Sequence, residues 1–378
     1  MKCLVLYSKP PIGGESIQGH MLYKGLKKLG INAESCDYQE SLEKSFSLKN
    51  PDVKLCYGVG SWIDVPEIVL SPLKHNVRPI PWFNSDGWVA NHKKAFEELD
   101  LMFTTSDWVK GIYQRDGVDV SKIFRAHIGI DTNLFKPNND TERNLALRRA
   151  IGVKDNEKMI LTIGGDTTSK GSQEMFKALS DVNKEFKDWK YVCKSWPSDC
   201  AREWREREIA LAKELNILDK IIFIDDIMSQ EFMAQILNSC DLYVAPSRIE
   251  GFGMIQVEAM ACGKPVISIN KMGPSETILH NKTGFLAKVA EEIQLEQEWA
   301  LPSMGFKEKH LVKFEHPKTF AYKADIDDLR EFTHKLLTDN ELRETMGNQA
   351  REHALQKFDY RVTSKHIWDI TKRELGLD

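Results

Sequence analysis

The chain has 378 residues, 42% hydrophobic and 29% charged, a composition typical of a globular protein long enough for two domains. Its formal net charge of −4 argues against a nucleic-acid binder with a dominant basic face. No apolar run approaches the roughly 18 residues that a membrane span needs. The seven cysteines are odd in number and form no Cys-x-x-Cys pair, which favours reduced thiols over disulfides or a metal site. We therefore expect a cytoplasmic protein without a metal, in contact with a membrane surface at most.

Short apolar runs alternate with amphipathic stretches along the chain. Strands alternating with helices predict parallel sheets covered by helices on both faces. Because the series of strands restarts after residue 150, we expect two Rossmann-like, doubly wound α/β domains, with ligands at the carboxyl ends of the strands. The expected strands are 2–8, 53–59, 78–83, 100–106 and 123–129, then 159–165, 190–195, 220–226, 241–247 and 264–269. The expected helices include 16–29, 88–98, 172–186, 201–215, 230–239, 325–338, 340–357 and 360–376.

The same pattern suggests where the domains begin and end. We expect an N-terminal domain over 1–150, a C-terminal domain over 151–357, and a final helix in 358–378 that packs back on the first domain. Residues 288–324 show no clear period and contain scattered proline, glycine and aromatic residues. This segment is predicted to be an irregular insertion, either an elaborated surface loop or a functional one.

Two glycine turns between a strand and a helix have the features of an anion site. The first contains Gly13 and Gly14, with Ser16 placed to cap the following helix. The second, IGGDTTSKGSQEMF (163–176), leads to Lys170. Its lysine precedes Gly171, which excludes a Walker A loop, but the turn, the lysine and the helix N-terminus suit a phosphate. The alternative for each is ordinary turn chemistry, with Lys170 as an exposed loop lysine.

A third glycine turn lies in SRIEGFGMIQVEAMACGKPVIS (247–268). Glu250 stands in the turn, whereas Glu258 stands in a helix that is otherwise apolar and is therefore predicted to be buried. A buried carboxylate without partners costs several kcal/mol, so Glu258 needs a partner. That partner is either a ligand with paired hydroxyls or a neighbouring lysine or arginine. The three turns together favour a nucleotide or nucleotide sugar, held through its diphosphate.

The spacing Glu250-x7-Glu258 resembles the EX7E region of the retaining GT-B glycosyltransferases of glycosyltransferase family 4. Further stretches resemble that family in the same order: IGIDTNLFKP (128–137), KGSQEMFKAL (170–179), KTGFL (282–286) and ELRETMGNQAREHALQKFDY (341–360). The resemblance covers most of residues 120–370, whereas residues 1–119 match mainly in pattern.

The resemblance implies a metal-independent retaining enzyme that needs no cofactor and has two Rossmann-like domains with a cleft between them. The N-terminal domain would be on the acceptor side and the C-terminal domain on the donor side. Its donor would be a UDP-, GDP- or ADP-linked sugar, and its acceptor a carbohydrate, a lipid-linked or a small molecule. Glu250 would contact the transferred sugar, Glu258 the ribose hydroxyls, and Lys170 the leaving diphosphate. The remaining donor contacts that it implies are Gly14, Gly165, Gly251, Phe252, Gly253 and Met254.

Two positions depart from the family pattern. Members carry an arginine shortly before the lysine of the phosphate loop, where this chain has Gly164 and Gly165; we expect Lys194 or Arg248 to substitute, with Lys194 preferred. Many members have a histidine after the fourth N-terminal strand, where this chain has Asn84, Ser85 and Asp86, and Asp86 becomes a candidate polar or basic catalytic group.

Two alternative functions remain open from the sequence. One is another GT-B enzyme, such as a nucleotide-sugar epimerase or a phosphorylase, although no lysine context matches a pyridoxal phosphate site. The other is a nucleotide-sugar-binding protein without catalysis, which the missing arginine and histidine would explain.

Overall fold

The computed structural model describes residues 1–10, 12–84, 87–138 and 140–377. Contacts divide the chain into two compact units. Unit 1 comprises Met1–Asp131, Gln294–Phe320 and Lys357–Asp378, and unit 2 comprises Thr132–Ile293 and Ala321–Gln356. The division near residue 131 lies upstream of the boundary expected at residue 150, and each unit is described separately below.

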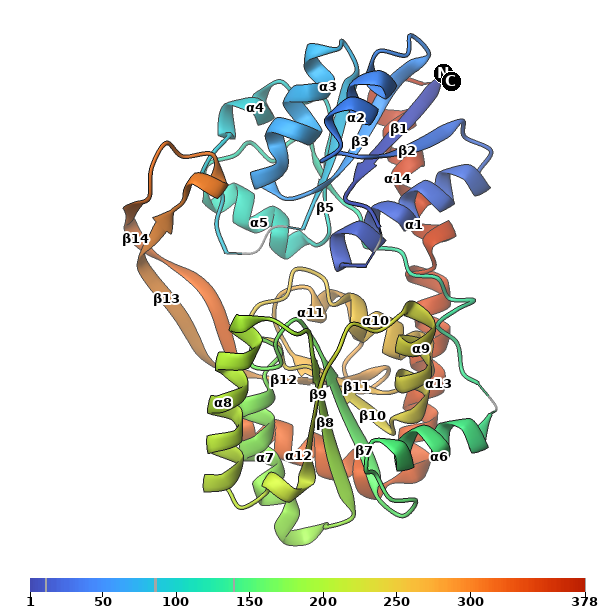
Figure 1. The fold of residues 1–378 in the computed structure, drawn as a ribbon, viewed down its shortest axis with the longest axis vertical. Helices are drawn as coiled ribbons and strands as arrows, with labels where there is room; N and C mark the ends of the chain where they lie inside the picture. Colours follow the sequence, from blue (N-terminus) through green and yellow to red (C-terminus); the bar gives the residue numbers. More distant parts are fainter. Residues whose placement is uncertain (11, 85–86, 139, 378) are drawn as a thin grey trace. The chain divides into compact units, whose positions relative to one another are not determined.

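Unit 1 contains a six-stranded parallel sheet with the strand order β2-β1-β3-β4-β5-β6 (Figure 1). Its strands are β1 Lys2–Tyr7, β2 Ala33–Asp37, β3 Val53–Gly60, β4 Arg78–Phe83, β5 Met102–Thr104 and β6 Ile123–Arg125. Its helices are α1 Gly14–Lys28, α2 Ser41–Leu48, α3 Ser71–Lys74, α4 Lys93–Glu97, α5 Asp107–Arg115 and α14 Tyr360–Leu375, with a 3-10 turn η1 at Trp62–Asp64 and a π-helix η2 at Pro66–Leu70. The C-terminal helix α14 is attached to this sheet, since the hydroxyl of Tyr57 on β3 donates to Oγ1 of Thr371 at 2.9 Å.

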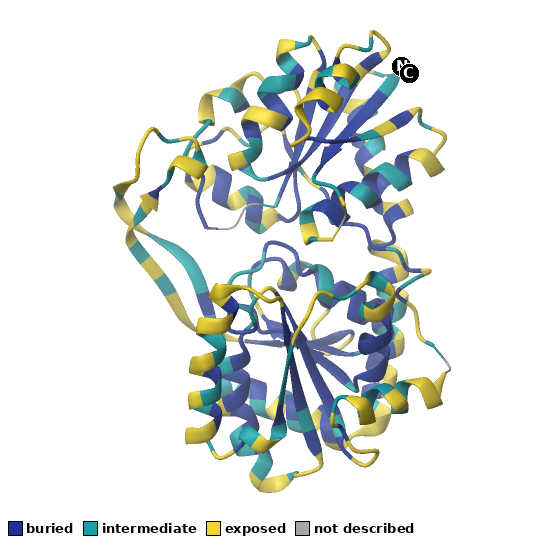
Figure 2. Ribbon diagram, in the orientation of Figure 1, coloured by how far each residue is buried: buried dark blue, intermediate teal, exposed yellow. Residues whose placement is uncertain are grey.

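Unit 2 contains a second six-stranded parallel sheet, with the order β12-β11-β10-β7-β8-β9. Its strands are β7 Lys158–Ile163, β8 Trp189–Ser195, β9 Ile221–Asp225, β10 Leu242–Val244, β11 Val266–Ile269 and β12 Gly284–Ala287. Its helices are α6 Thr141–Ala150, α7 Ser172–Glu185, α8 Asp199–Glu214, α9 Gln230–Ser239, α10 Met254–Ala261, α11 Pro274–Thr277, α12 Ile326–Thr338 and α13 Asn340–Lys357, with a 3-10 turn η3 at Leu218–Lys220. Helices cover both faces, so the central strands of both sheets are buried (Figure 2). The prediction of two doubly wound parallel sheets is confirmed.

The segment 288–324 is regular, and the prediction of an irregular insertion was wrong. It forms a two-stranded sheet of β13 Val289–Ala300 and β14 His310–Ala324, drawn as a long ribbon in Figure 1, with a 3-10 turn η4 at Pro302–Met304 between the strands. Most side chains of β13 are exposed or half-buried. Because charged and polar residues occupy most of these open positions, the period-2 pattern of a half-buried strand is hidden in the sequence. We call residues 289–324 the hairpin; its central part, Gln294–Phe320, belongs to unit 1.

Sequence reasoning also missed β2 and α2 in unit 1. The strand AESCD is short and lies at the edge of its sheet, where Glu34 is exposed. Edge strands tolerate polar residues, so no apolar run marks them. Among the described residues, no helix is long and apolar enough to cross a membrane.

Candidate functional site

The strand order of unit 2 reverses direction between β7 and β10, which lie side by side at the centre of the sheet. In a doubly wound sheet, ligands bind beyond the carboxyl ends of the two strands at such a reversal, because the following loops diverge there. The loop after β7 leads to Lys170, and the loop after β10 leads to Glu250. The fold therefore brings two of the sequence-predicted residues to the place where a ligand is expected.

Lys170 and Glu250 form an ion pair across these two loops. Nζ of Lys170 lies 2.7 Å from Oε2 of Glu250, and the side chains are 22% and 18% exposed. The other carboxylate oxygen of Glu250, Oε1, accepts a hydrogen bond of 3.0 Å from the backbone N–H of Gly253. Both groups thus remain accessible while their positions are set by the protein.

Glycine at three positions makes this arrangement possible. A Cβ on Gly164 would lie 2.6 Å from the carbonyl oxygen of Asp166 and 2.7 Å from Cγ of Lys170, so no side chain fits there without displacing this loop. Gly171 and Gly253, the N-caps of α7 and α10, have φ values of 83° and 94°, which favour glycine. Gly164, at a position where the family pattern has an arginine, therefore leaves space for the side chain of Lys170. Gly165, in contrast, has open space around it.

Glu258 is buried in α10, as predicted. It is 2% exposed, and among the residues that the structure describes its Oε1 has no hydrogen-bond partner. Burial raises the pKa of its carboxyl group to about 8. The alternative expectation, an ion pair with a lysine or arginine, finds no support in the described part of the chain. Glu258 is thus a buried acceptor that a ligand hydroxyl would satisfy.

Lys194 lies at the carboxyl end of β8, beside the end of β7. Its carbonyl oxygen accepts from the backbone N–H of Gly164 at 3.0 Å, and its side chain is 1% exposed. Burial lowers the pKa of its ammonium group to about 8, although Asp226 and Asp225 act in the opposite direction. No carboxylate of the described residues forms an ion pair with it, and its Nζ lies 5.9 Å from the centre of the Trp196 ring. A nearby phosphate would stabilise the charged form of this buried ammonium group.

Arg248 is the weaker substitute for the family arginine. Its guanidinium group donates to Oε1 of Glu174 on α7 at 2.7 Å and to Oε1 of Gln173 at 3.3 Å. Its backbone N–H donates to the carbonyl oxygen of Ser169 at 2.8 Å, which joins the two glycine loops. Arg248 is thus already paired within the protein.

Sequence reasoning missed Glu208 on α8, which holds the loop of Lys170 in place. Its side chain is 1% exposed and accepts hydrogen bonds from Oγ1 of Thr167 at 2.8 and 3.0 Å, from Oγ1 of Thr168 at 2.9 Å and from Oγ of Ser172. One buried carboxylate therefore fixes three hydroxyls on both sides of Lys170. The cluster of hydroxyl residues in DTTSKGS was the available signal; nothing in the sequence points to their partner.

The other predicted residues are distributed over both units. Phe252 is 2% exposed, between Gly251 and Gly253, and Met254 begins α10. Gly14 is the first residue of α1, in unit 1. Asp86 lies outside the described residues.

Comparison with solved structures shows to which fold class the chain belongs. The chain resembles HepE of Anabaena, solved with UDP and glucose, with a TM-score of 0.74 at 16% identity over 99% of this chain and 100% of the other. Two doubly wound parallel sheets in this arrangement of the chain are the GT-B fold.

The sequence comparisons show similarity to one family over part of the chain. Residues 144–300 match the family model of glycosyl transferases group 1. The chain is 26% identical to an uncharacterized glycosyltransferase of Methanocaldococcus jannaschii, over 79% of this chain and 63% of that protein. It is 25% identical to N-acetyl-alpha-D-glucosaminyl L-malate synthase of Bacillus anthracis, over 66% of this chain and 57% of that protein. The matches thus span about 60% of the length of these relatives, and the match to the glycosyl transferases group 1 model covers part of the chain.

Proposed function

We propose that the protein is a retaining glycosyltransferase that moves a sugar from a nucleotide-diphosphate sugar to an acceptor hydroxyl. The observation that carries this proposal is the pairing of Lys170 with Glu250 where the strand order reverses. Glu250 lies in the same loop-and-helix segment as Glu258, whose buried Oε1 has no partner among the described residues. A cation for phosphate and two acceptors for sugar hydroxyls are the groups that such a donor requires.

In the proposed step, the acceptor oxygen forms a bond to the anomeric carbon of the donor sugar on the face from which the diphosphate leaves. The bond between that carbon and the diphosphate oxygen breaks, and its electron pair stays on the diphosphate. The acceptor proton passes to the leaving diphosphate, so no metal is needed. Lys170, Lys194 and the N-termini of α7 and α10 stabilise the charge that develops there.

Each glutamate has its own role in this proposal. Glu250 accepts hydrogen bonds from the transferred sugar, and Glu258 accepts them from the ribose hydroxyls. Because Lys170 is bound to Glu250 in the protein alone, donor binding exchanges this internal pair for two contacts with the ligand. The structural neighbour that was solved with UDP and with UDP-glucose supports a uridine diphosphate sugar as the first donor to test.

Isothermal titration with UDP, GDP and ADP tests donor binding, and hydrolysis of the matching sugar nucleotides tests turnover. We expect one nucleotide to bind and its sugar donor to be cleaved slowly by water. Binding without hydrolysis or transfer over a wide acceptor panel would instead indicate a nucleotide-sugar-binding protein. Absence of binding by all three nucleotides would contradict the proposal as a whole.

Glu250→Gln separates the catalytic site from the fold. We expect transfer to fall below detection while the Tm changes little, because Glu250 is on a loop and is partly exposed. Glu276→Gln, on the short helix α11, is the matched control. Retained activity in Glu250→Gln would remove this residue from the site.

A further inference from the structure

Unit 1 has its own reversal of strand order, between β1 and β3, and a pocket lies there. The pocket has a volume of about 320 Å³. Its lining comes from the first turn of α1 after β1 (Glu15), from the turn after β3 (Ser61, Trp62 and Ile63) and from the end of β4 (Asn84). Ligands of doubly wound sheets bind at this point, so the fold predicts a binding function for it.

The hairpin supplies one wall of this pocket. Met304, in the turn between β13 and β14, lines it together with Trp88. The turn is held to unit 1 by the side-chain amide of Asn91, whose Nδ2 donates to the carbonyl oxygens of Met304 and Gly305, both at 3.2 Å. Met304 also packs against the hydrophobic core of unit 1.

A buried aspartate also joins the hairpin to the rest of unit 1. The side chain of Asp116 is fully buried and accepts from Nζ of Lys318 on the hairpin at 2.6 Å and from the backbone N–H of Val89 at 2.7 Å. The rings of Trp88 and Phe314 meet edge to face, with centroids 5.2 Å apart. The wall that contains Met304 is therefore fixed in place and is part of the pocket.

The charge of the pocket limits what it can bind. Glu15 is the one ionisable side chain among the described lining residues. Asp64 is close to it, and burial together with this second carboxylate raises the pKa of Glu15. Asp64 is fully engaged with the protein, since it accepts from the N–H of Ser61 at 2.7 Å and from the hydroxyl of Tyr38 at 3.2 Å. Among the described lining residues, a phosphorylated or carboxylated ligand would meet the carboxylate of Glu15, with Asp64 close to it, and no cation.

The remaining lining groups match hydroxyls and sugar rings. The carboxyl group of Glu15, the amide of Asn84 and the hydroxyl of Ser61 offer both donors and acceptors. The indoles of Trp62 and Trp88 and the side chain of Met304 offer apolar surface. A few polar groups in an apolar lining are typical of small-molecule sites.

We propose that this pocket binds a neutral, polyhydroxylated acceptor such as an unphosphorylated sugar, and that Met304 of the hairpin sets the size of the acceptor that fits. The role as acceptor rests on the proposed function, whereas binding of the neutral sugar to the pocket does not. The two can therefore be tested separately.

The test is the binding of a sugar panel to the whole protein without a donor, measured by saturation-transfer NMR. The panel contains neutral mono- and disaccharides, their phosphates, uronic acids and amino sugars. We expect neutral sugars to bind, and Met304→Trp, which fills the pocket, to weaken them at least tenfold while the affinity for UDP is unchanged. Leu311→Trp, on an exposed position of the same hairpin, is the matched control and should bind as the wild type does.

Glu15→Lys tests the charge argument directly. We expect it to lose the preference for neutral sugars and to gain binding of sugar phosphates, because a cation replaces the carboxylate. Glu97→Lys, which adds the same charge at an exposed position of unit 1, should leave the preference unchanged.

Three results would overturn the inference: no binding of any neutral sugar, a wild-type preference for charged sugars, or Met304→Trp behaving as the wild type. Absence of nucleotide binding with intact sugar binding would instead contradict the proposed function and leave the pocket assignment standing.

Discussion

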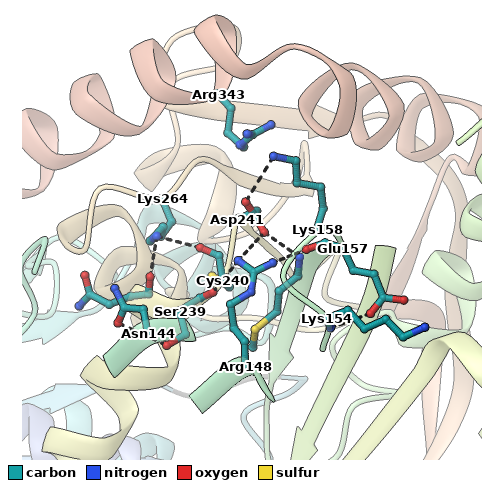
Figure 3. A network of polar contacts seen from close by, with 12 residues as sticks. Asn144, Arg148, Lys154, Glu157, Lys158, Ser239, Cys240, Asp241, Lys264 and Arg343 are labelled. Atoms are coloured by element: carbon teal, nitrogen blue, oxygen red, sulfur yellow. Dashed lines mark hydrogen bonds and ion pairs between the residues drawn. The ribbon is translucent and has the colours of Figure 1, made fainter. Parts of the chain in front are cut away.

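The two ends of β7 and β10 differ in how their charged groups are satisfied. At the amino ends, Asp241 accepts from Arg148 at 3.0 Å and from the backbone N–H of Met159 at 2.7 Å, and Nζ of Lys158 lies 3.9 Å from its other oxygen (Figure 3). Nearby, Nζ of Lys264 donates to the carbonyl oxygens of Asn238 and Cys240, both at 2.8 Å. The polar groups at this end therefore hold α6, β7 and β10 together.

At the carboxyl ends, the charges are held in place but are not fully satisfied. Glu258 has a buried oxygen without a partner among the described residues, and Lys194 is buried with no ion pair in that part of the chain. Both groups have pKa values of about 8, because burial disfavours the charged form of each. Leaving polar groups in this state lowers stability. The polar groups at the amino ends therefore serve folding, whereas those at the carboxyl ends fit the ligand site proposed above.

The largest effect is expected from Lys170→Ala at the carboxyl end. Removing one group that stabilises charge in a transition state typically lowers kcat about 10²–10³-fold, and we expect a loss of this size with a small change in Tm. Steady-state kinetics and thermal unfolding measure the two quantities. Lys177→Ala, at an exposed position of helix α7, which follows the loop of Lys170, is the control, and equal losses in both variants would remove the distinction between the two ends.

At the amino end, Asp241→Asn should lower stability and leave activity unchanged. It leaves Arg148 and Lys158 without their carboxylate, and we expect a loss of about 2 kcal/mol in the free energy of unfolding, because breaking a partly buried pair is costly. That corresponds to a fall in Tm of about 4–8 °C for a domain of this size. The kcat of the folded protein should stay unchanged. The control is Asp155→Asn, which breaks an exposed ion pair with Arg149. Arg149 lies on α6, as Arg148 does, and this variant should leave the Tm unchanged.

Glu208→Gln tests a residue that belongs to the carboxyl end but acts through others. Oε1 of Glu208 accepts from Thr167, Thr168 and Ser172 together, and a neutral amide oxygen binds three donors more weakly than a charged carboxylate oxygen, so the loop of Lys170 becomes less ordered. We expect the KM for the donor to rise about tenfold, since one lost contact with a charged group is worth roughly 1.5 kcal/mol. Glu206→Gln, on the exposed side of α8, is the control.

A double variant distinguishes positioning from stability for Glu208. If Glu208 acts through Lys170, Glu208→Gln should add little to the effect of Lys170→Ala on donor binding. Additive losses, or a fall in Tm that accounts for the lost activity, would show that Glu208 supports the fold alone.

The sequence predicted the glycine turns that follow the strands better than it predicted the tertiary contacts between distant residues. The glycine turns and the spacing of Glu250 and Glu258 are local patterns, so they were visible without coordinates. The role of Glu208 was not visible, because α8 contains many charged residues and only tertiary packing selects the buried one. The function of Gly164 as space for Lys170 likewise depends on a contact that no local pattern encodes.

The hairpin and the pocket of unit 1 were missed for a related reason. Met304 reaches the pocket only because the hairpin returns to unit 1, more than 200 residues after Asn91 in the sequence. Long-range arrangements of this kind follow from packing and not from periodicity.

The effect of Glu258→Gln is expected to appear as a dependence of stability on pH. Because the pKa of this carboxyl group is about 8 in the folded protein and about 4.3 when unfolded, the folded state holds a proton that the unfolded state releases. Wild-type stability should therefore fall, relative to Glu258→Gln, as the pH rises from about 5 through 8. Thermal unfolding of both proteins over this range measures the difference, and equal slopes would contradict the pKa.

Nucleotide binding provides the second readout on the same residue. Ribose hydroxyls donate to the ionised carboxylate and lower its pKa, so binding near pH 7 should release a proton from Glu258 in the wild type. Titration in buffers of different ionisation enthalpy measures that proton, and Glu258→Gln should abolish it. The proton change at Lys194 should have the opposite sign. A bound phosphate raises the pKa of its ammonium group, so Lys194 takes up a proton near pH 8. Proton release at pH 7 that changes to uptake at higher pH would therefore place both unsatisfied groups against one ligand.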